Sequence, residues 1–261
     1  MTFKIDSPTC ISFSGGRTSA YMLWRVLQEN NGLPEEAKVC FANTGKEDEA
    51  TLRFVDRCSK EWGVPITWLE YRAGPTFEVV DFDTASRDGE PFAELIEKRN
   101  YLPNPVARFC TGELKVLTID RYFKSIGVPE YDTMVGIRAD EQRRAAKMKD
   151  GKLIPLARAG VTQADVQDFW KKSSFDLELE FHDGVTASGN CDLCFLKGAH
   201  QIQSLIQQKP ERAIWWAKQE QIVGATFRSD RPTYAQMARF AEQQTDMFDP
   251  KEEGIACFCG D

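Results

Sequence analysis

The sequence predicts an α/β protein in which a doubly wound, mostly parallel sheet carries a helical appendage at its C-terminal end. A β-type run over residues 9–13 ends in two glycines and leads into a helical pattern, and strand and helix alternate again over residues 37–70. Strands that alternate with helices are joined by right-handed crossovers, which gives a parallel sheet covered on both faces. Beyond Pro155 the patterns are helical. We therefore expect two regions, residues 1–160 with the sheet and residues 161–261 with the appended helices.

The elements of the first half follow in order from the N-terminus. Residues 9–13, 37–42 and 65–70 are short apolar runs bounded by turn residues, a pattern typical of buried strands. Apolar residues recur at helical spacing after Gly16 and over residues 47–62. This half therefore has the strand–helix–strand order of crossover units.

The rest of the chain starts with a long loop. Residues 72–107 are rich in Gly, Pro, Asp and Arg, which predicts a loop with a short helix at residues 91–98. Loops of this length usually serve a site. A helix over residues 113–124 and a strand over residues 131–135 are expected next. The remaining predicted helices cover residues 163–172, 193–208, 210–221 and 232–244.

Composition and charge limit the classes of function. Hydrophobic residues make up 42% and charged residues 28% of the 261 residues, as in globular proteins, and no apolar run is long enough to cross a bilayer. The N-terminus lacks the features of an export signal, so we expect a cytoplasmic protein with no membrane partner. The formal net charge of −7 argues against non-specific binding to nucleic acid, although a local basic groove would still permit it. The sequence indicates no oligomeric state.

A glycine-rich loop follows the first predicted strand. Its two glycines let the backbone approach an anion, and the amides that follow point outward at a helix start, where the helix dipole favours negative charge. Neighbouring hydroxyls add donors, and an arginine can hold a phosphate as a bidentate fork. The spacing is neither that of a Walker P-loop nor that of a dinucleotide fingerprint. The candidate anion loop consists of Ser14, Gly15, Gly16, Arg17, Thr18 and Ser19.

Several segments, in a fixed order, carry a family resemblance. They are S-F-S-G-G-R-T-S-A from Ser12, F-A-N-T-G-K-E-D-E-A-T from Phe41, R-F-C-T-G-E-L-K from Arg108, G-I-R-A-D-E-Q-R-R from Gly136, and I-P-L followed by T-Q-A-D-V-Q-D-F-W. The first resembles the pyrophosphate loop of the PP-loop ATP pyrophosphatase superfamily. Together, over about residues 8–172, the segments resemble its phosphoadenosine phosphosulfate (PAPS) reductase-like branch. The resemblance implies a HUP-like sheet that binds an adenine nucleotide, either ATP or PAPS.

The resemblance also implies roles for individual residues. The loop would grip phosphate or sulfate oxygens, and the strand end Asn43-Thr44-Gly45 would lie beside the nucleoside. Members of the family often have Asp at the position of Asn43. The other residues that match positions around the anionic substrate are Lys115, Gly136, Arg138, Glu141 and Arg144.

Three of these residues are cations. Three cations beside one anion loop indicate that a polyanion binds among them. Lys115 and Arg138, in a catalytic role, would stabilise charge that develops on phosphate. A solvated helix face is the alternative interpretation for Arg144, and it is the favoured one for Lys147 and Lys149.

The cysteines cluster in the C-terminal third. Eight cysteines in a cytoplasmic chain should be reduced, so clustering indicates metal or redox chemistry rather than disulfides. The clusters are Cys191-Asp192-Leu193-Cys194 and Cys257-Phe258-Cys259. Two thiolates three positions apart at a turn into a helix can bind one metal centre, which more distant cysteines complete.

The related adenosine phosphosulfate reductases hold a [4Fe–4S] cluster with a Cys-Cys pair and a later C-x-x-C, and this chain keeps the first cysteine of the pair. The resemblance implies the ligands Cys110, Cys191 and Cys194, with Cys257 from the tail as the fourth. Cys259 would then be the sulfur nucleophile, since thiolate fraction and access set thiol reactivity. The alternatives are a Zn²⁺ site of Cys191, Cys194, Cys257 and Cys259, and no metal at all.

The remaining cysteines and tryptophans have ordinary structural interpretations. Cys10, Cys40 and Cys58 lie in predicted strands or at core-like helix spacing and are expected to be small buried hydrophobes. Trp215 and Trp216 are expected to pack between helices, with a base-stacking platform for nucleic acid as the alternative.

These observations favour an enzyme that handles sulfur on an adenine nucleotide. In one chemistry a thiolate attacks the sulfonate of the bound nucleotide, and a reductant or sulfur-donor protein is the partner. In a second, ATP adenylates a base or other acceptor for sulfur or nitrogen insertion. The third hypothesis, which Asn43 favours slightly, is a non-catalytic nucleotide-binding subunit of a modification complex.

Overall fold

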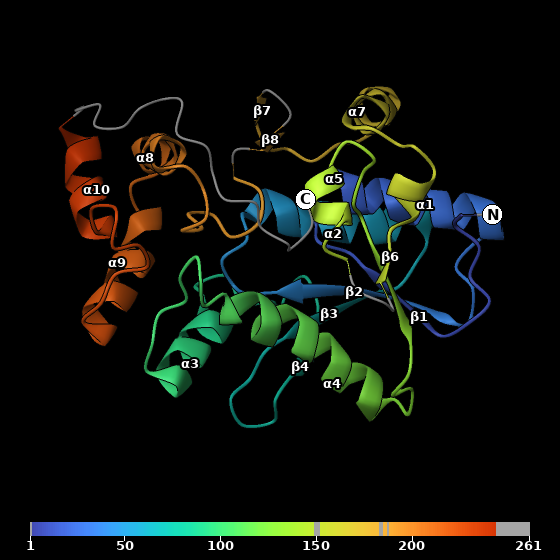
Figure 1. The fold of residues 1–261 in the computed structure, drawn as a ribbon, viewed down its shortest axis with the longest axis horizontal. Coiled ribbons are helices and arrows are strands. Elements are labelled where there is room, and N and C mark those ends of the chain that lie inside the picture. Colours follow the sequence, from blue (N-terminus) through green and yellow to red (C-terminus); the bar gives the residue numbers. More distant parts are fainter. Residues whose placement is uncertain (1, 149–151, 183–184, 187, 244–261) are drawn as a thin grey trace.

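The computed structural model of the chain describes residues 2–148, 152–182, 185–186 and 188–243. Its centre is a six-stranded sheet in the order β4-β3-β2-β1-β5-β6, in which β4 is antiparallel to β3 and the other neighbours are parallel (Figure 1). The strands are β1 (Thr9–Ser12), β2 (Ala37–Asn43), β3 (Ile66–Glu70), β4 (Glu78–Val80), β5 (Asp132–Val135) and β6 (Lys152–Leu153). A two-stranded sheet pairs β7 (Phe181–His182) with β8 (Val185–Thr186).

Helices cover both faces of the sheet. Figure 1 shows α1 and α2 along one face and α3 and α4 along the other, with α8, α9 and α10 beyond one end. The helices of the first part are α1 (Arg17–Asn30), α2 (Glu49–Trp62), α3 (Glu90–Arg99), the π-helix η1 (Thr111–Leu117), α4 (Thr118–Ser125), α5 (Gln142–Ala145) and α6 (Pro155–Arg158). The later helices are α7 (Gln163–Lys172), α8 (Ala199–Gln208), α9 (Arg212–Val223) and α10 (Tyr234–Glu242). The predicted fold class, a mostly parallel α/β sheet with C-terminal helices, is confirmed.

The sequence accounts for the limits of α2. Asp48 is its N-cap, and the carboxylate accepts a hydrogen bond from Ala50 N at 3.0 Å, which also places negative charge at the positive end of the helix dipole. Gly63 ends the helix in a left-handed conformation with φ +61°. Asp48 thus marks the end of the connection from β2, and Gly63 marks the start of the connection to β3.

The strand order has a switch point beside β1. The chain passes from β1 outward to β2 and β3, and then returns to place β5 on the other side of β1. In the register, Ser12 at the end of β1 is paired with Cys40 of β2 and with Val135 of β5. Open α/β sheets bind ligands outside the carboxyl ends of their strands at such a switch point. The loop that follows Ser12 lies at that place.

The described residues form two main hydrophobic clusters. One cluster contains the sheet, α1 and α2, and it extends to Trp170, Phe175 and Leu177, so α7 packs on α1. The other contains the C-terminal helices around the fully buried Trp216, together with Phe92 of α3. The expected boundary at residue 160 therefore lies inside the first cluster.

The start of α8 differs from the prediction. A helix was expected from residue 193, but α8 begins at Ala199 because the segment before it forms turns, with Cys194 N bonded to Cys191 O and Lys197 N bonded to Cys194 O. Tyr234 Oη also donates to Leu193 O at 2.6 Å, which takes up a carbonyl that a helix would use. The C-x-x-C motif thus lies on a turn that precedes the helix.

Two further differences lie in the middle of the chain. The region expected as a long loop contributes β4 to the edge of the sheet, and the helix expected at residues 113–124 starts with the π-helical turn η1. Among the described residues, no helix combines the length and the apolar character needed to cross a membrane.

Candidate functional site

The anion loop connects the end of β1 to the start of α1. Gly15 has a φ of +81°, a left-handed conformation that glycine adopts without strain. A Cβ added there would lie 2.6 Å from Cγ2 of Thr51 in α2, so the loop also needs glycine for space. Gly16 is the N-cap of α1, which places the amides of the next residues at the positive end of the helix dipole. The loop therefore has the backbone of an anion site.

Two serine hydroxyls close this loop. Ser14 Oγ donates to Ser19 Oγ at 3.0 Å, and the Ser14 amide donates to the same oxygen at 3.2 Å. Ser19 Oγ in turn donates to Gly16 O at 3.0 Å. These bonds hold the turn closed. Because a hydroxyl has a single hydrogen, each serine would have to leave its present acceptor in order to donate to an oxyanion.

The chain after β5 lies against the first turn of α1. A Cβ on Gly136 would be 3.1 Å from Ser19 Cα, so glycine permits this close approach. Arg138 Nη1 then donates to Thr18 Oγ1 at 3.0 Å, and Glu141 Oε2 accepts from the Arg138 amide at 2.9 Å. The structure thus brings the predicted residues of this segment to the anion loop.

Arg144 is a buried cation in the same group. Its residue is 8% exposed, and its Nη1 is paired with the Glu141 carboxylate. Nε and Nη2 have no hydrogen-bond partner among the described residues, although both are buried. Buried guanidinium donors without a partner are costly, so this edge of Arg144 is suited to a bidentate oxyanion. The interpretation of Arg144 as part of a solvated helix face is wrong.

A cavity of about 450 Å³, which we call the switch-point cavity, opens beside the loop. Its lining combines hydroxyls and lysines with apolar side chains from β5, η1 and α4. Such a mixture fits a ligand with an anionic end and a flat apolar part. Its lining residues are Ser12, Ser14, Ser19, Thr111, Lys115, Val116, Ile119, Tyr131, Thr133, Val135, Gly136, Lys147, Met148 and Lys152.

Two lysines of this cavity were not assigned to the site from the sequence. Lys147 was expected to be solvated and is exposed, and it also lines the cavity. Lys152 lies in β6 opposite Thr133, and its Nζ donates to Thr133 Oγ1 at 3.0 Å. Only the pairing of β6 with β5 brings Lys152 to the site, and a two-residue strand leaves no periodic signal in the sequence.

Arg17 is oriented differently from the expectation. Its guanidinium forms a bidentate pair with Asp176, at 2.8 and 2.9 Å, and also donates to Leu179 O. The side chain therefore binds the segment after α7 to the start of α1. The prediction that this guanidinium holds a phosphate as a bidentate fork is wrong, because its fork is engaged by Asp176. The Arg17 amide remains part of the first turn of α1.

Asn43 supports the end of β2 from within the protein. Its Nδ2 donates to Glu70 Oε1 at 2.6 Å and to Ser86 O at 2.9 Å, and its Oδ1 accepts from Gly45 N at 3.1 Å. Asn43 and Glu70 are both fully buried. Because the neighbour is a buried carboxylate, an amide fits here where an aspartate would place two like charges in contact. The amide shapes the Thr44-Gly45 turn, and Asn43 is not among the residues that line the switch-point cavity.

A second, smaller cavity of about 20 Å³, the thiol cavity, lies next to this turn. Cys110 at the start of η1 and the two cysteines of the C-x-x-C motif, Cys191 and Cys194, all line it. Within the described residues, no group of three or more His, Cys, Asp and Glu side chains is positioned to hold a metal ion. Cys257 and Cys259, the other expected participants, lie outside those residues.

Cys191 has a mixed environment. Its Sγ is 3.4 Å from Thr44 Oγ1. Burial, and after it the Glu47 carboxylate, raise the pKa of this thiol well above its ordinary value, whereas the Lys115 ammonium lowers it. A cation close to the thiol cavity is therefore needed if the sulfur is to carry negative charge.

Ion pairs hold the C-x-x-C turn against the end of β2. Lys46 Nζ is 3.3 Å from Asp192 Oδ2, and the other oxygen of this carboxylate accepts from Trp216 Nε1 at 2.9 Å. Arg212, the first residue of α9, pairs with Asp48 at the start of α2. The appended helices thus place the two cysteines near the carboxyl ends of the strands, where the anion loop also lies.

The two cavities share part of their walls. Thr111 and Lys115, both in η1, line the switch-point cavity and also the thiol cavity. A π-helical turn is uncommon and is often found at functional sites. The arrangement puts a cation between an anion site and a group of thiols.

Comparison with known proteins gives the family of the chain. It is 31% identical, over 228 residues, to the uncharacterized nin region protein ORF290 of Escherichia phage lambda, and the match covers 84% of this chain and 75% of that protein. The chain belongs to the ORF290 family.

Other comparisons are more distant. An uncharacterized 37.8 kDa protein of Escherichia phage 186 is 23% identical over 310 residues, which cover 98% of this chain and 88% of that protein. A crystal structure of PAPS reductase from Candida auris, in complex with phosphate, has a TM-score of 0.41 and 16% sequence identity and covers 64% of this chain and 73% of that one. No protein-family model matches the chain.

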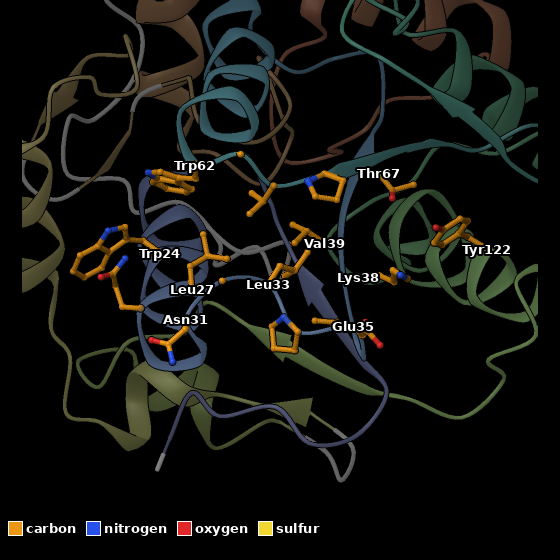
Figure 2. Close-up of a pocket in the computed structure, with 17 residues that line it drawn as sticks. Trp24, Leu27, Asn31, Leu33, Glu35, Lys38, Val39, Trp62, Thr67 and Tyr122 are labelled. Carbon is orange, nitrogen blue, oxygen red and sulfur yellow. The ribbon is translucent and has the colours of Figure 1, made fainter.

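A larger cavity of about 870 Å³ in this ORF290 family member lies at the amino ends of the strands (Figure 2). Figure 2 shows Leu27 of α1 between Trp24 and Val39 of β2, with Trp62 from the end of α2 nearby. The charged lining residues, Glu35 and Lys38, are exposed. Because open α/β sheets bind ligands at the carboxyl ends of their strands, we do not assign the anion to this cavity.

The structural interpretation of the remaining cysteines and tryptophans is confirmed in this ORF290 family member. Cys10, Cys40 and Cys58 are fully buried. Trp216 is fully buried, and Trp215 packs against Phe92 with ring centroids 5.3 Å apart. The pair therefore packs between helices.

Proposed function

We propose that this ORF290 family protein is a PAPS reductase-like enzyme, which binds an adenine nucleotide in the switch-point cavity and acts in sulfur reduction or transfer. The observation that carries the proposal is the wall that this cavity shares with the thiol cavity. Because Thr111 and Lys115 line both, a nucleotide on the anion loop would have its reacting end close to cysteine sulfur.

The cation set supports an anionic nucleotide. The amides at the start of α1 would hold phosphate or sulfate oxygens, and Lys115, Lys147 and Lys152 line the same cavity. The unpaired donors of Arg144, which shares the Glu141 carboxylate with Arg138, would make a further oxyanion contact. The apolar part of the lining would take the flat base.

The three thiols of the thiol cavity fit a soft metal centre in donor type. Cys110, Cys191 and Cys194 would be ligands of a [4Fe–4S] cluster, with Cys257 as the fourth. A Zn²⁺ ion held by Cys191, Cys194, Cys257 and Cys259 is the alternative. A bound cluster would supply redox or electrostatic chemistry beside the nucleotide.

The proposed reaction is thiol attack on a sulfonucleotide. The Cys259 thiolate would attack the sulfonate sulfur of PAPS, so that a sulfur–sulfur bond forms, the sulfur–oxygen bond to phosphate breaks, and the nucleotide leaves as the bisphosphate. Lys115 and Arg138 would stabilise the charge on the departing phosphate. A partner dithiol protein would then reduce the S-sulfocysteine and release sulfite.

One observation favours the adenylating alternative. The switch-point cavity extends from the loop over β5 to Lys152 of β6, which leaves room for an acceptor beside a bound ATP. By contrast, Asn43 no longer favours a non-catalytic subunit, because its amide is matched to the buried Glu70 rather than being a lost catalytic carboxylate.

Product analysis would test these functions. We would purify the protein without oxygen, measure its iron, sulfide and zinc, and then assay sulfite release from PAPS with a dithiol reductant and pyrophosphate release from ATP. The proposal predicts about four irons and sulfite release that requires Cys259, tested with Cys259→Ser and with Cys58→Ser as a control. Pyrophosphate without sulfite would favour adenylation, and neither product would leave only nucleotide binding.

A further inference from the structure

Glu47 is a buried carboxylate that lies between the two cavities. Its side chain is 2% exposed. Oε2 accepts from Thr44 N at 2.9 Å and from Thr44 Oγ1 at 2.8 Å, so one oxygen is fully engaged by the turn after β2. Oε1 has no hydrogen bond within the described residues, and it lies 3.8 Å from Lys115 Nζ. The carboxylate therefore has one fixed oxygen and one that faces a cation.

The surroundings keep this carboxylate in place. Glu47 forms an isolated antiparallel bridge with Cys191, and the adjacent Lys46 is tied to Asp192 by an ion pair of 3.3 Å. Both contacts come from the C-x-x-C turn, and Thr44 holds the carboxylate from the other side. Glu47 is thus held both through its backbone bridge and through one carboxylate oxygen.

Lys115 depends on such a fixed partner. A lysine side chain is flexible and loses rotamer entropy when it is held in one position, so an anchor favours an ammonium that must meet a ligand. The Lys115 side chain is 15% exposed and extends from η1 into the wall shared by both cavities. An ammonium has three donors, so a carboxylate and an oxyanion can share it.

We propose that Glu47 is a positioning residue for Lys115, whose ammonium it holds toward the anionic end of the bound nucleotide. This inference rests on the proposed nucleotide site. It assigns a role to Glu47 that depends entirely on Lys115, because Glu47 itself does not line the switch-point cavity.

A double-mutant cycle on the full chain tests this dependence. The affinities for ATP and PAPS would be measured by calorimetric titration for the wild type, Glu47→Gln, Lys115→Met and the double variant. We expect Glu47→Gln to weaken binding roughly threefold to tenfold, as for residues coupled through one contact. In the Lys115→Met background, Glu47→Gln should have no further effect. Glu49→Gln is the matched control, because it removes the same charge two residues away in the sequence, from a partly exposed pair with Arg87.

Several outcomes would overturn the inference. A Glu47→Gln protein that binds as tightly as the wild type, or more tightly, would show that the carboxylate only repels the ligand. Equal losses in the wild-type and Lys115→Met backgrounds would show a role independent of Lys115. If Glu47→Gln does not fold, Glu47→Asp keeps the charge at a shorter reach and should show a smaller loss that again vanishes without Lys115. Wild-type protein that binds neither nucleotide would instead refute the proposed function.

Discussion

At the scale of single residues, the site depends on buried groups whose neighbours decide their chemistry. Asn43 is an example, since its amide is matched to the Glu70 carboxylate in a fully buried pair. The Asn43→Asp variant would bring two carboxylates together and remove the donor to Ser86 O. We expect it to lose about 3–5 kcal/mol of stability at pH 8.

The loss should be smaller at pH 5, because the contact raises the pKa of the pair and protonation of one carboxyl group relieves the repulsion. Urea unfolding of the variant and the wild type at the two pH values measures this difference in stability. Asn104→Asp is a control, because Asn104 accepts from the amides of Val106 and Ala107 through an oxygen that Asp retains. Equal stability of Asn43→Asp and the wild type at pH 8 would contradict the assigned contact.

Gly15 tests the anion loop itself. An alanine there needs a left-handed φ and places its Cβ 2.6 Å from Thr51, so the turn must shift. We expect Gly15→Ala to lower the unfolding free energy by about 1–3 kcal/mol and to weaken nucleotide binding at least tenfold. Gly74→Ala, which has open space and no positive φ, should change neither quantity. Unchanged nucleotide affinity in a folded Gly15→Ala protein would remove the loop from the site.

At the scale of elements, a buried carboxylate links two of the C-terminal helices. Glu220 of α9 accepts from Phe227 N at 3.2 Å and from Tyr234 N at 2.8 Å, which joins the start of α10 to α9. Burial raises the pKa of Glu220 above its ordinary value of 4.5. A carboxyl group whose pKa is raised by folding binds its proton more tightly in the folded protein. Its ionisation therefore lowers the free energy of unfolding by the full amount above the folded-state pKa, and by nothing below the unfolded-state pKa.

The Glu220→Gln variant keeps an acceptor oxygen without the charge. We therefore expect it to be at least as stable as the wild type at pH 8, and the wild type to gain stability relative to it as the pH falls toward 4.5. Thermal unfolding over this range would show the trend. A wild-type advantage that grows with rising pH would contradict it.

At the scale of the whole molecule, ion pairs connect the appended helices to the sheet. Arg212 of α9 pairs with Asp48, and both side chains are largely buried, with 12% and 9% exposure. Arg212→Met should cost about 3–5 kcal/mol because it leaves a buried carboxylate without its cation. The double variant Arg212→Met/Asp48→Asn should recover most of this, since Asn also caps helices well. Additive losses in denaturant unfolding would contradict the pairing.

Much of the fold could be predicted from the sequence, because strand–helix alternation and the Gly15-Gly16 turn are local signals. The approach of Arg138 to the loop was also predictable, because a motif carries each of them. Lys152 could not be predicted, because strand pairing across a long connection brings it to the cavity. The orientation of Arg17 was equally hidden, since its partner Asp176 is 159 residues away in the chain.

The central claim is that the carboxyl ends of β1 and β5 hold a nucleotide's anionic end. A crystal structure of the protein with ATP or PAPS would test it most directly. We predict phosphate or sulfate oxygens within hydrogen-bond distance of the amides at residues 15–19, with Lys115 in contact. Nucleotide bound instead in the cavity of Figure 2, at the amino ends of the strands, would contradict the claim.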